Sequence, residues 1–264
     1  MKKKSIFLAV ALIAAACGSP ERMRMEDPVD YVNPLMGTAS TYELSTGNTY
    51  PAIALPWGMN FWTPQTGANG DGWTYTYSST KIRGLKQTHQ PSPWINDYGS
   101  FSIMPVTTGP VYDEDGRQSW FSHKAETVKP YYYQVYLAEH DVVAELAPTE
   151  RAAAFRLTYP EKEMSYLVVD AYNGGQAEVL KDRNMIVGYS TANHGGVTEN
   201  FRNWFVVVSD TPFETHTVDG HIAMVGFKTA KGQKVNLKVA SSFISQTQAE
   251  LNLNELGDRT FDEI

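Results

Sequence analysis

The sequence predicts an all-β protein, an antiparallel β-sandwich, and three observations lead to that prediction. Apolar residues alternate with polar ones along several short segments, as strands with one buried face require. Turn sequences rich in glycine separate these segments. No helix-length apolar pattern interrupts them before residue 245. A succession of short strands without intervening helices favours two packed antiparallel sheets over an α/β fold.

Most of the strands are expected in the second half of the chain. Four segments show period-two alternation and are expected to be half-buried strands. Their apolar positions are Tyr131, Tyr133, Val135 and Leu137; Val142, Ala144 and Leu146; Phe155 and Leu157; and Val235, Leu237 and Val239. Two continuous apolar runs, 166–169 and 205–208, predict strands buried on both faces. Between residue 30 and about residue 69, short apolar pieces predict strands joined by long loops.

The N-terminus carries an export signal. Three lysines, residues 2–4, precede an apolar run from Ile6 to Ala16, and Cys17 follows directly. The run is shorter than the roughly 20 residues that a membrane-spanning helix needs. We therefore expect residues 1–16 to be a signal peptide, Cys17 to be lipidated, and residues 17–28 to be a tether. This predicts an outer-membrane lipoprotein in the periplasm or at the cell surface. The alternative is an ordinary cleaved signal in which the cysteine is incidental.

Charge and cysteine content exclude several classes of partner. The formal net charge is −7, and no basic stripe is present, so nucleic-acid binding is not expected. The chain has one cysteine, so no internal disulfide can form and the core must supply the stability. Motifs for a nucleophilic serine, a phosphate-binding glycine loop and a zinc site are all missing from the sequence.

The character of the sequence changes after Ser245. Ala249, Leu253 and Leu256 have helical spacing, and the segment from Thr260 to Glu263 has the form of a helix N-terminal capping box. The expected organisation is a β-sandwich domain at residues 29–245 followed by the start of a linker helix at 246–264. A chain that stops after a capping box predicts the front part of a longer protein. The alternative is a frayed tail on a complete domain.

The candidate binding site lies between residues 70 and 105. Two strand-like pieces, Trp73–Tyr77 and Ser100–Met104, flank a segment whose Pro91 and Pro93 exclude a regular helix or a central strand. This predicts a shaped loop, and loops on rigid scaffolds carry binding groups.

Within this segment the candidate sugar-binding residues are Trp73, His89, Trp94 and Asp97. The tryptophans would stack on a sugar ring, and His89 and Asp97 would hydrogen-bond its hydroxyls. Three of the four also have a structural alternative: Trp73 as part of the core, His89 as a structural histidine, and Asp97 as the cap of a turn. Trp94, between Pro93 and Ile95, has no obvious core face to join. No metal ligands and no catalytic residues are assigned in this chain.

Several motifs then give a family resemblance. In order along the chain they are Val32–Thr38, Gly47–Ala52, Leu55–Met59, Gly72–Trp73, Gln87–Pro91, Asp97–Gly99 and Met104–Pro105. Together they resemble the N-terminal domain of glycoside hydrolase family 92, the calcium-dependent exo-acting α-mannosidases, and the resemblance extends from about Asp30 to the C-terminus. Where the family often has His-Leu-Ser-Gly, this sequence has His89 followed by Gln, Pro and Ser, which leaves the linkage preference open.

The resemblance implies a supersandwich-like domain packed on an (α/α)6 barrel, with the active site at their junction. It implies hydrolysis of terminal mannose from glycans with inversion, with α-1,2 linkages as the first candidate. The catalytic carboxylates and most ligands of the calcium would come from the barrel, so this chain alone would be inactive. The competing hypothesis is a free-standing carbohydrate-binding or interaction module.

Overall fold

The computed structural model describes residues 27–39, 49–90 and 94–264, which form two units. The described part of the first unit is a short 3-10 helix, η1 (Pro28–Tyr31). The second unit, residues 32–264, holds all the strands of the described chain. Cys17, Pro91 and Pro93 lie outside the described residues.

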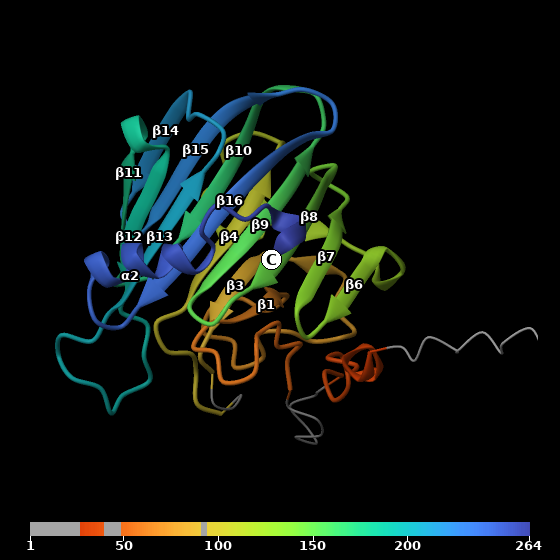
Figure 1. Ribbon diagram of the computed structural model, residues 1–264, viewed down its shortest axis with the longest axis vertical. Coiled ribbons are helices and arrows are strands. Elements are labelled where there is room, and N and C mark those ends of the chain that lie inside the picture. The colour runs from red at the N-terminus through yellow and green to blue at the C-terminus, as the bar shows by residue number, and fades with distance from the viewer. Residues whose placement is uncertain (1–26, 40–48, 91–93) are drawn as a thin grey trace, which may run out of the picture. The chain divides into compact units, whose positions relative to one another are not determined.

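Two antiparallel sheets make up the second unit (Figure 1). The six-stranded sheet has the order β1 (Phe61–Gln65), β3 (Gly84–Thr88), β4 (Phe101–Val106), β10 (Lys162–Asp170), β15 (Ile222–Thr229), β14 (Thr215–Asp219). The eight-stranded sheet has the order β11 (Gln176–Leu180), β12 (Met185–Ser190), β13 (Asn203–Ser209), β16 (Gln233–Ser242), β9 (Ala152–Tyr159), β8 (Val142–Pro148), β7 (Tyr132–Leu137), β6 (Glu126–Lys129). The predicted all-β sandwich is confirmed.

Small elements complete the description. A two-stranded ribbon pairs β2 (Lys81–Ile82) with β5 (Ser119–Trp120). Short helices lie in the connections and after the last strand: α1 (Glu114–Arg117), η2 (His123–Ala125), η3 (Lys181–Arg183), α2 (Gln246–Asn252), η4 (Leu253–Glu255) and η5 (Phe261–Glu263). Among the described residues no helix is long and apolar enough to cross a membrane.

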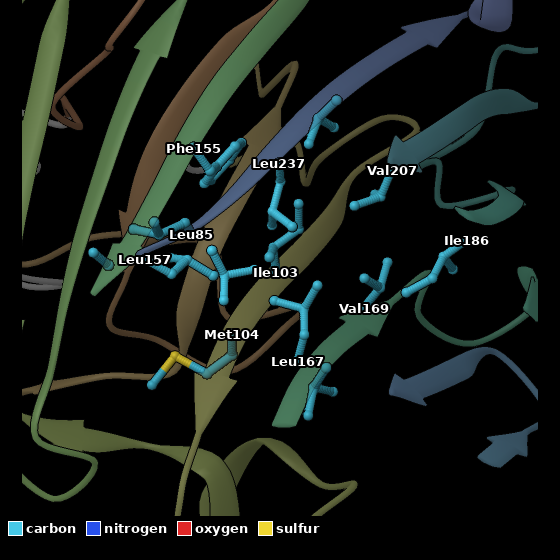
Figure 2. Close-up of a cluster of buried hydrophobic side chains, with 14 of the residues drawn as sticks. Leu85, Ile103, Met104, Phe155, Leu157, Leu167, Val169, Ile186, Val207 and Leu237 are labelled. Atoms are coloured by element: carbon cyan, nitrogen blue, oxygen red, sulfur yellow. The ribbon is translucent and has the colours of Figure 1, made fainter. Parts of the chain in front are cut away.

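The main core lies between the two sheets, where apolar side chains from both sheets meet (Figure 2). Leu157 and Leu237 come from the eight-stranded sheet, and Ile103 and Leu167 come from the six-stranded sheet. All four are fully or almost fully buried. For Leu157 and Leu237 this burial confirms the prediction made from alternation. Their burial from water supplies the main stabilisation of the fold.

Strand β13 confirms the prediction of a strand buried on both faces. Phe205 and Val207 belong to the core between the sheets. Val206 belongs to a second apolar cluster on the other face of the same sheet, and Val208 packs against that cluster. Ala249 of helix α2 completes the second cluster, so the helix covers this outer face.

The C-terminal segment forms the predicted helical turns. Ser245 caps α2, since its hydroxyl accepts a hydrogen bond from the Gln248 N–H at 3.1 Å. Ala249 and Leu256 are fully buried, which confirms that the spacing marked an apolar helical face. The capping box of Thr260 and Glu263 is also present, at the start of η5.

One predicted strand is wrong. Residues 73–77 form no strand. The other predicted piece, Ser100–Met104, is confirmed by β4, which spans Phe101–Val106. Trp73, Thr74 and Tyr75 are all buried in succession, which a two-faced strand at an open edge would not produce. The alternating aromatic residues belong to a loop in which these three successive side chains are all buried. No strand of the described chain pairs with this loop, so it does not join a sheet.

Candidate functional site

Three loops contact one another through hydrogen bonds, and we call the region where they meet the loop end. They are residues 66–76 after β1, the described residues 89–90 and 94–100 between β3 and β4, and residues 191–202 between β12 and β13. The Asn96 side-chain amide donates to the Gly70 carbonyl at 2.9 Å, and the Tyr98 hydroxyl donates to the Gly195 carbonyl at 3.1 Å. These bonds hold the second loop against the other two.

Gln90 gives a second connection between the first two loops. Its side-chain oxygen accepts from the Thr74 hydroxyl at 2.9 Å, and its nitrogen donates to the Gly72 carbonyl at 2.6 Å. Gln90 is buried, so an unpaired amide here would be unfavourable and the two contacts fix the relative position of the loops.

The two candidate tryptophans form an edge-to-face pair. The ring centroids of Trp73 and Trp94 are 5.8 Å apart, with an interplanar angle of 76°. Trp73 is 7% exposed, whereas Trp94 is 61% exposed. Trp73 therefore supports the pair from inside the fold, and Trp94 presents the aromatic surface to solvent.

Asp97 organises the backbone of its own loop. One carboxylate oxygen accepts from the His89 N–H at 2.7 Å and from the Tyr98 N–H at 2.8 Å. The turn-capping role weighed from the sequence is therefore present in the structure. Only 6% of the residue is exposed, so a direct contact between Asp97 and a ligand would need the loop to open.

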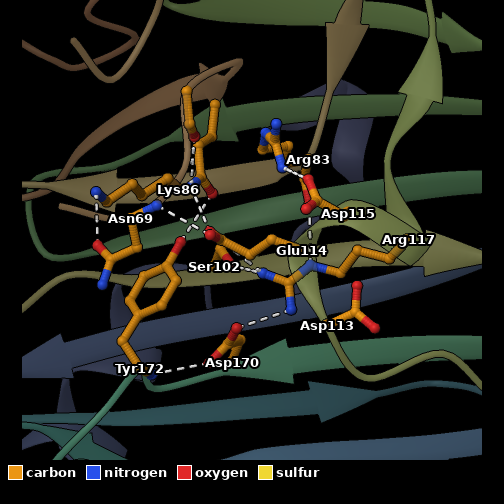
Figure 3. Close-up of polar contacts among 12 residues, drawn as sticks. Asn69, Arg83, Lys86, Ser102, Asp113, Glu114, Asp115, Arg117, Asp170 and Tyr172 are labelled. Atoms are coloured by element: carbon orange, nitrogen blue, oxygen red, sulfur yellow. Dashed lines mark hydrogen bonds and ion pairs between the residues drawn. The ribbon is translucent and has the colours of Figure 1, made fainter. Parts of the chain in front are cut away.

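The sequence analysis missed Lys86, which lies behind Asp97. Its ammonium nitrogen is 3.3 Å from the other Asp97 carboxylate oxygen. The same nitrogen is 3.4 Å from the Asn69 amide oxygen and lies over the Tyr172 ring, 5.4 Å from the centroid (Figure 3). Lysine is almost never fully buried without a partner, so Lys86 and Asp97 are expected to stabilise each other inside the fold.

His89 is oriented by the same loop. Its Nδ1 lies 2.8 Å from the Tyr98 carbonyl oxygen, which can only accept, so Nδ1 carries the proton. Burial lowers the pKa of His89, and the Asp97 charge and the bond to Tyr98 only partly oppose this. The imidazole is therefore neutral at pH 7, and it also packs edge-on against Phe243, with centroids 5.0 Å apart.

A buried polar network lies beneath the first loop (Figure 3). The Glu114 carboxylate accepts from the Gln65 amide at 2.6 Å and from the Asn69 N–H at 2.9 Å. Arg117, which is fully buried, donates to Asp170 at 2.7 Å. This network fixes the base of the loop that carries Trp73, and no motif in the sequence pointed to it.

The described residues do not fit a calcium site. Calcium binds six to eight oxygen ligands, mainly from carboxylates and carbonyls. Across residues 27–39, 49–90 and 94–264, no group of three or more Asp, Glu, His or Cys side chains is arranged to hold a metal. Asp97 is paired with Lys86, whose charge would repel a cation at that position.

Comparison with known proteins agrees with the motifs. The family model described as the glycosyl hydrolase family 92 N-terminal domain matches residues 31–252. No curated protein sequence matches the chain.

Solved structures resemble the chain over most of its length. The family GH92 inverting mannosidase BT2199 from Bacteroides thetaiotaomicron is 45% identical, with a TM-score of 0.84 over 89% of this chain and 34% of that chain. The family GH92 alpha-mannosidase BT3965 from the same organism is 24% identical, with a TM-score of 0.74 over 90% of this chain and 36% of that chain. A structure of BT3965 in complex with mannoimidazole is also 24% identical, with a TM-score of 0.72 over 90% of this chain and 35% of that chain.

The chain thus spans about a third of the length of these mannosidase structures. The resemblance that the motifs between Val32 and Pro105 predicted is confirmed by a family match over most of the described fold. The chain therefore belongs to glycosyl hydrolase family 92, in which it corresponds to the N-terminal domain.

Proposed function

We propose that this chain is the substrate-pocket-contributing N-terminal domain of an exo-α-mannosidase that removes terminal mannose from glycans with inversion. The observation that carries the proposal is the 45% identity to an inverting mannosidase over 89% of this chain. The site supports it, because the loop end combines an exposed aromatic surface with fixed polar groups, as sugar pockets do.

In this proposal Trp94 binds the apolar face of a sugar ring, and Trp73 holds it in place. Asp97 acts as a positioning residue, because it fixes the His89 and Tyr98 backbone from inside the fold. Any direct hydrogen bond from His89 or Asp97 to a sugar hydroxyl would need a small opening of the 89–100 loop. Of the four residues chosen from the sequence, Trp94 thus provides the exposed binding surface. The other three stabilise the loop from inside the fold.

Inversion needs a general acid and a general base whose carboxyl groups lie roughly 6.5–9.5 Å apart, so that a water molecule fits on the far side of the sugar. Asp97 pairs with a lysine and has no second carboxylate in the described part of its loop. We therefore assign both catalytic carboxylates to an (α/α)6 barrel domain of the parent chain. The calcium of the family would likewise be bound mainly there, and no step proposed for the present residues depends on it.

The test compares two proteins on an aryl α-mannoside and on α-1,2-mannobiose with calcium present. The first is this chain, and the second is the polypeptide encoded by any continuing reading frame downstream of Ile264. We expect turnover only from the longer protein, with release of β-mannose. Turnover by this chain alone would overturn the assignment of the catalytic groups to the barrel.

The same assay on α-1,2-, α-1,3- and α-1,6-mannobiose decides the linkage, for which we propose α-1,2. If the frame stops after Ile264 and the chain is expressed by itself, the free-standing binding module replaces the enzyme hypothesis. We also propose export with lipid attachment at Cys17, which places the domain at the membrane surface through its anchor.

A further inference from the structure

A groove of about 400 Å³ lies on the outer face of the eight-stranded sheet, beside the start of helix α2. Three strands and the helix supply its lining: Gln176, Ala177 and Glu178 of β11; Val187, Gly188 and Tyr189 of β12; Trp204 of β13; and Gln246 of α2. In Figure 1 α2 lies beside β12 and β13, two of the strands that line this groove. Its volume is in the ~300–1,000 Å³ range of small-molecule sites.

The groove is on the opposite face of β13 from the loop that carries Trp94 and Asp97. Successive residues of a strand point to opposite faces. Asn203 points toward the loop end, where its amide donates to the Gly99 carbonyl at 2.7 Å. Trp204, the next residue, contacts the outer cluster under α2. A ligand in the groove would therefore occupy a site separate from the Trp73–Trp94 pair.

The floor of the groove is a cross-strand aromatic pair. Tyr189 and Trp204 are register partners on β12 and β13, and their ring centroids are 4.9 Å apart at an interplanar angle of 64°. The Arg202 guanidinium lies over the Tyr189 ring, 4.8 Å from its centroid. Because the two rings support each other and both remain partly exposed, they form a fixed aromatic surface.

Polar side chains surround that surface. Gln176 and Glu178 lie on β11, two residues apart and so on the same face. Gln246 lines the opposite side, and its amide nitrogen is buried and has no hydrogen-bond partner among the described residues. A buried donor without a partner is unfavourable, so a ligand hydroxyl that reaches this amide would satisfy it.

We propose that this groove is a second carbohydrate-binding site, which takes one pyranose ring of a glycan. The apolar face of the ring would lie on Trp204, while its hydroxyls would bond to the amides of Gln176 and Gln246 and to the Glu178 carboxylate. The carboxylate disfavours an anionic ligand, and the two amides would be left unpaired by a purely apolar one. The choice of mannosides as probes rests on the proposed function, whereas the groove itself does not.

The experiment titrates the purified chain with methyl α-D-mannopyranoside and, separately, with methyl β-D-glucopyranoside, using calorimetry and saturation-transfer NMR. A Trp94→Ala background removes the exposed aromatic surface of the loop end, so that the remaining binding reports the groove. In that background Trp204→Leu keeps an apolar contact for α2 but removes the aromatic surface. Gln246→Ala removes only the unpartnered amide.

We expect weak binding that falls about tenfold or more in Trp204→Leu and about three- to tenfold in Gln246→Ala. The thermal midpoint of Gln246→Ala should equal that of the Trp94→Ala protein. If Trp204→Leu does not fold, Gln246→Ala alone therefore tests whether the groove binds the sugar. Binding of the glucoside alone would support the groove while counting against mannose as its ligand. No binding of either probe, or binding unchanged in both variants, would overturn the proposal.

Discussion

The ammonium nitrogen of Lys86 lies 3.3 Å from a carboxylate oxygen of Asp97, and only 4% of each side chain is exposed. Lys86 belongs to β3, whereas Asp97 belongs to the loop that follows this strand. The ion pair therefore connects the candidate sugar-binding loop to the rigid sheet. Because both charges have lost most of their hydration, each depends on the other.

We predict that Lys86→Met lowers the free energy of unfolding by about 3–5 kcal/mol, since it leaves the Asp97 carboxylate buried without a counter-charge. Urea denaturation of the purified chain measures this. The double variant Lys86→Met, Asp97→Asn is the control, because it leaves no buried charge and should recover much of the loss. A single variant within about 0.5 kcal/mol of the wild-type protein would show that the pair does not matter for folding.

The two tryptophans of the loop end should separate binding from stability. Trp94→Ala should change the free energy of unfolding by no more than about 0.5 kcal/mol, because most of its surface is already exposed. In the longer enzyme it should lower kcat/KM by an amount equivalent to about 2–4 kcal/mol of transition-state stabilisation. Trp73→Ala should lower both quantities, because its ring is buried.

Thermal midpoints and kcat/KM measured on the same variants distinguish these effects. Trp120→Ala is the matched control: Trp120 is 49% exposed and lies on β5, and its removal should leave kcat/KM unchanged. Asp97→Ala should lower kcat/KM by an amount equivalent to about 2–4 kcal/mol of transition-state stabilisation, and it should also lower the free energy of unfolding. A folded Trp94→Ala enzyme with normal kcat/KM would remove Trp94 from the site.

The sequence predicted the sandwich well because strand burial leaves a local pattern. Tyr133, Val135 and Leu137 alternate in the sequence and are buried in β7. The run at Phe205–Val208 had no alternation because α2 covers the second face of its strand.

The site was only partly predictable. The loop end was proposed because prolines and aromatic residues cluster there in the sequence, and the structure places Trp73 against an exposed Trp94. Its role in binding stays a prediction. Lys86 could not be found, because a lysine on a strand normally extends into solvent, and its partner lies 11 residues further along the chain. The supporting contacts of Glu114 with Asn69 and of Arg117 with Asp170 are likewise tertiary and leave no local pattern in the sequence.

A histidine in the turn between β14 and β15 should make stability depend on pH. The His221 imidazole lies 2.8 Å from Asp170, and this hydrogen bond raises the pKa of His221 above its ordinary value. Burial raises the pKa of Asp170, but the bonds from His221 and Arg117 outweigh it, so the pKa of Asp170 is lowered. Protonated His221 therefore stabilises the folded state.

This stabilisation is complete below about pH 6.5, the ordinary pKa of histidine, and is lost as the pH rises through the raised pKa of the folded state. The contribution of Asp170 is lost only in acid, below its ordinary range. We predict that stability to urea declines from pH 6.5 to pH 9 more steeply in the wild-type protein than in His221→Gln. His216→Gln, on the exposed strand β14, should keep the wild-type slope. Equal slopes in all three proteins would contradict the prediction.

If Cys17 is lipidated, replacing it should release the protein from the membrane. Cys17→Ser should move the protein from the detergent phase to the aqueous phase in a partitioning assay of expressed cells, because it removes the acylated position. Ser19→Ala, two residues further on, serves as the control and should stay in the detergent phase. Unchanged partitioning of Cys17→Ser would mean that the membrane association, if any, has another cause.

The centre of the eight-stranded sheet pairs β9 with β16, so that Ala152 lies opposite Ala240 and Tyr159 lies opposite Gln233. A ribosome must therefore synthesise the chain through β16, which ends at Ser242, before the middle of this sheet can close. All-β sandwiches dominated by such distant pairings fold in roughly milliseconds to seconds, slower than helical bundles of similar size. For a protein that we propose to be exported, late closure lengthens the period in which the chain is still unfolded and able to thread through a translocation channel.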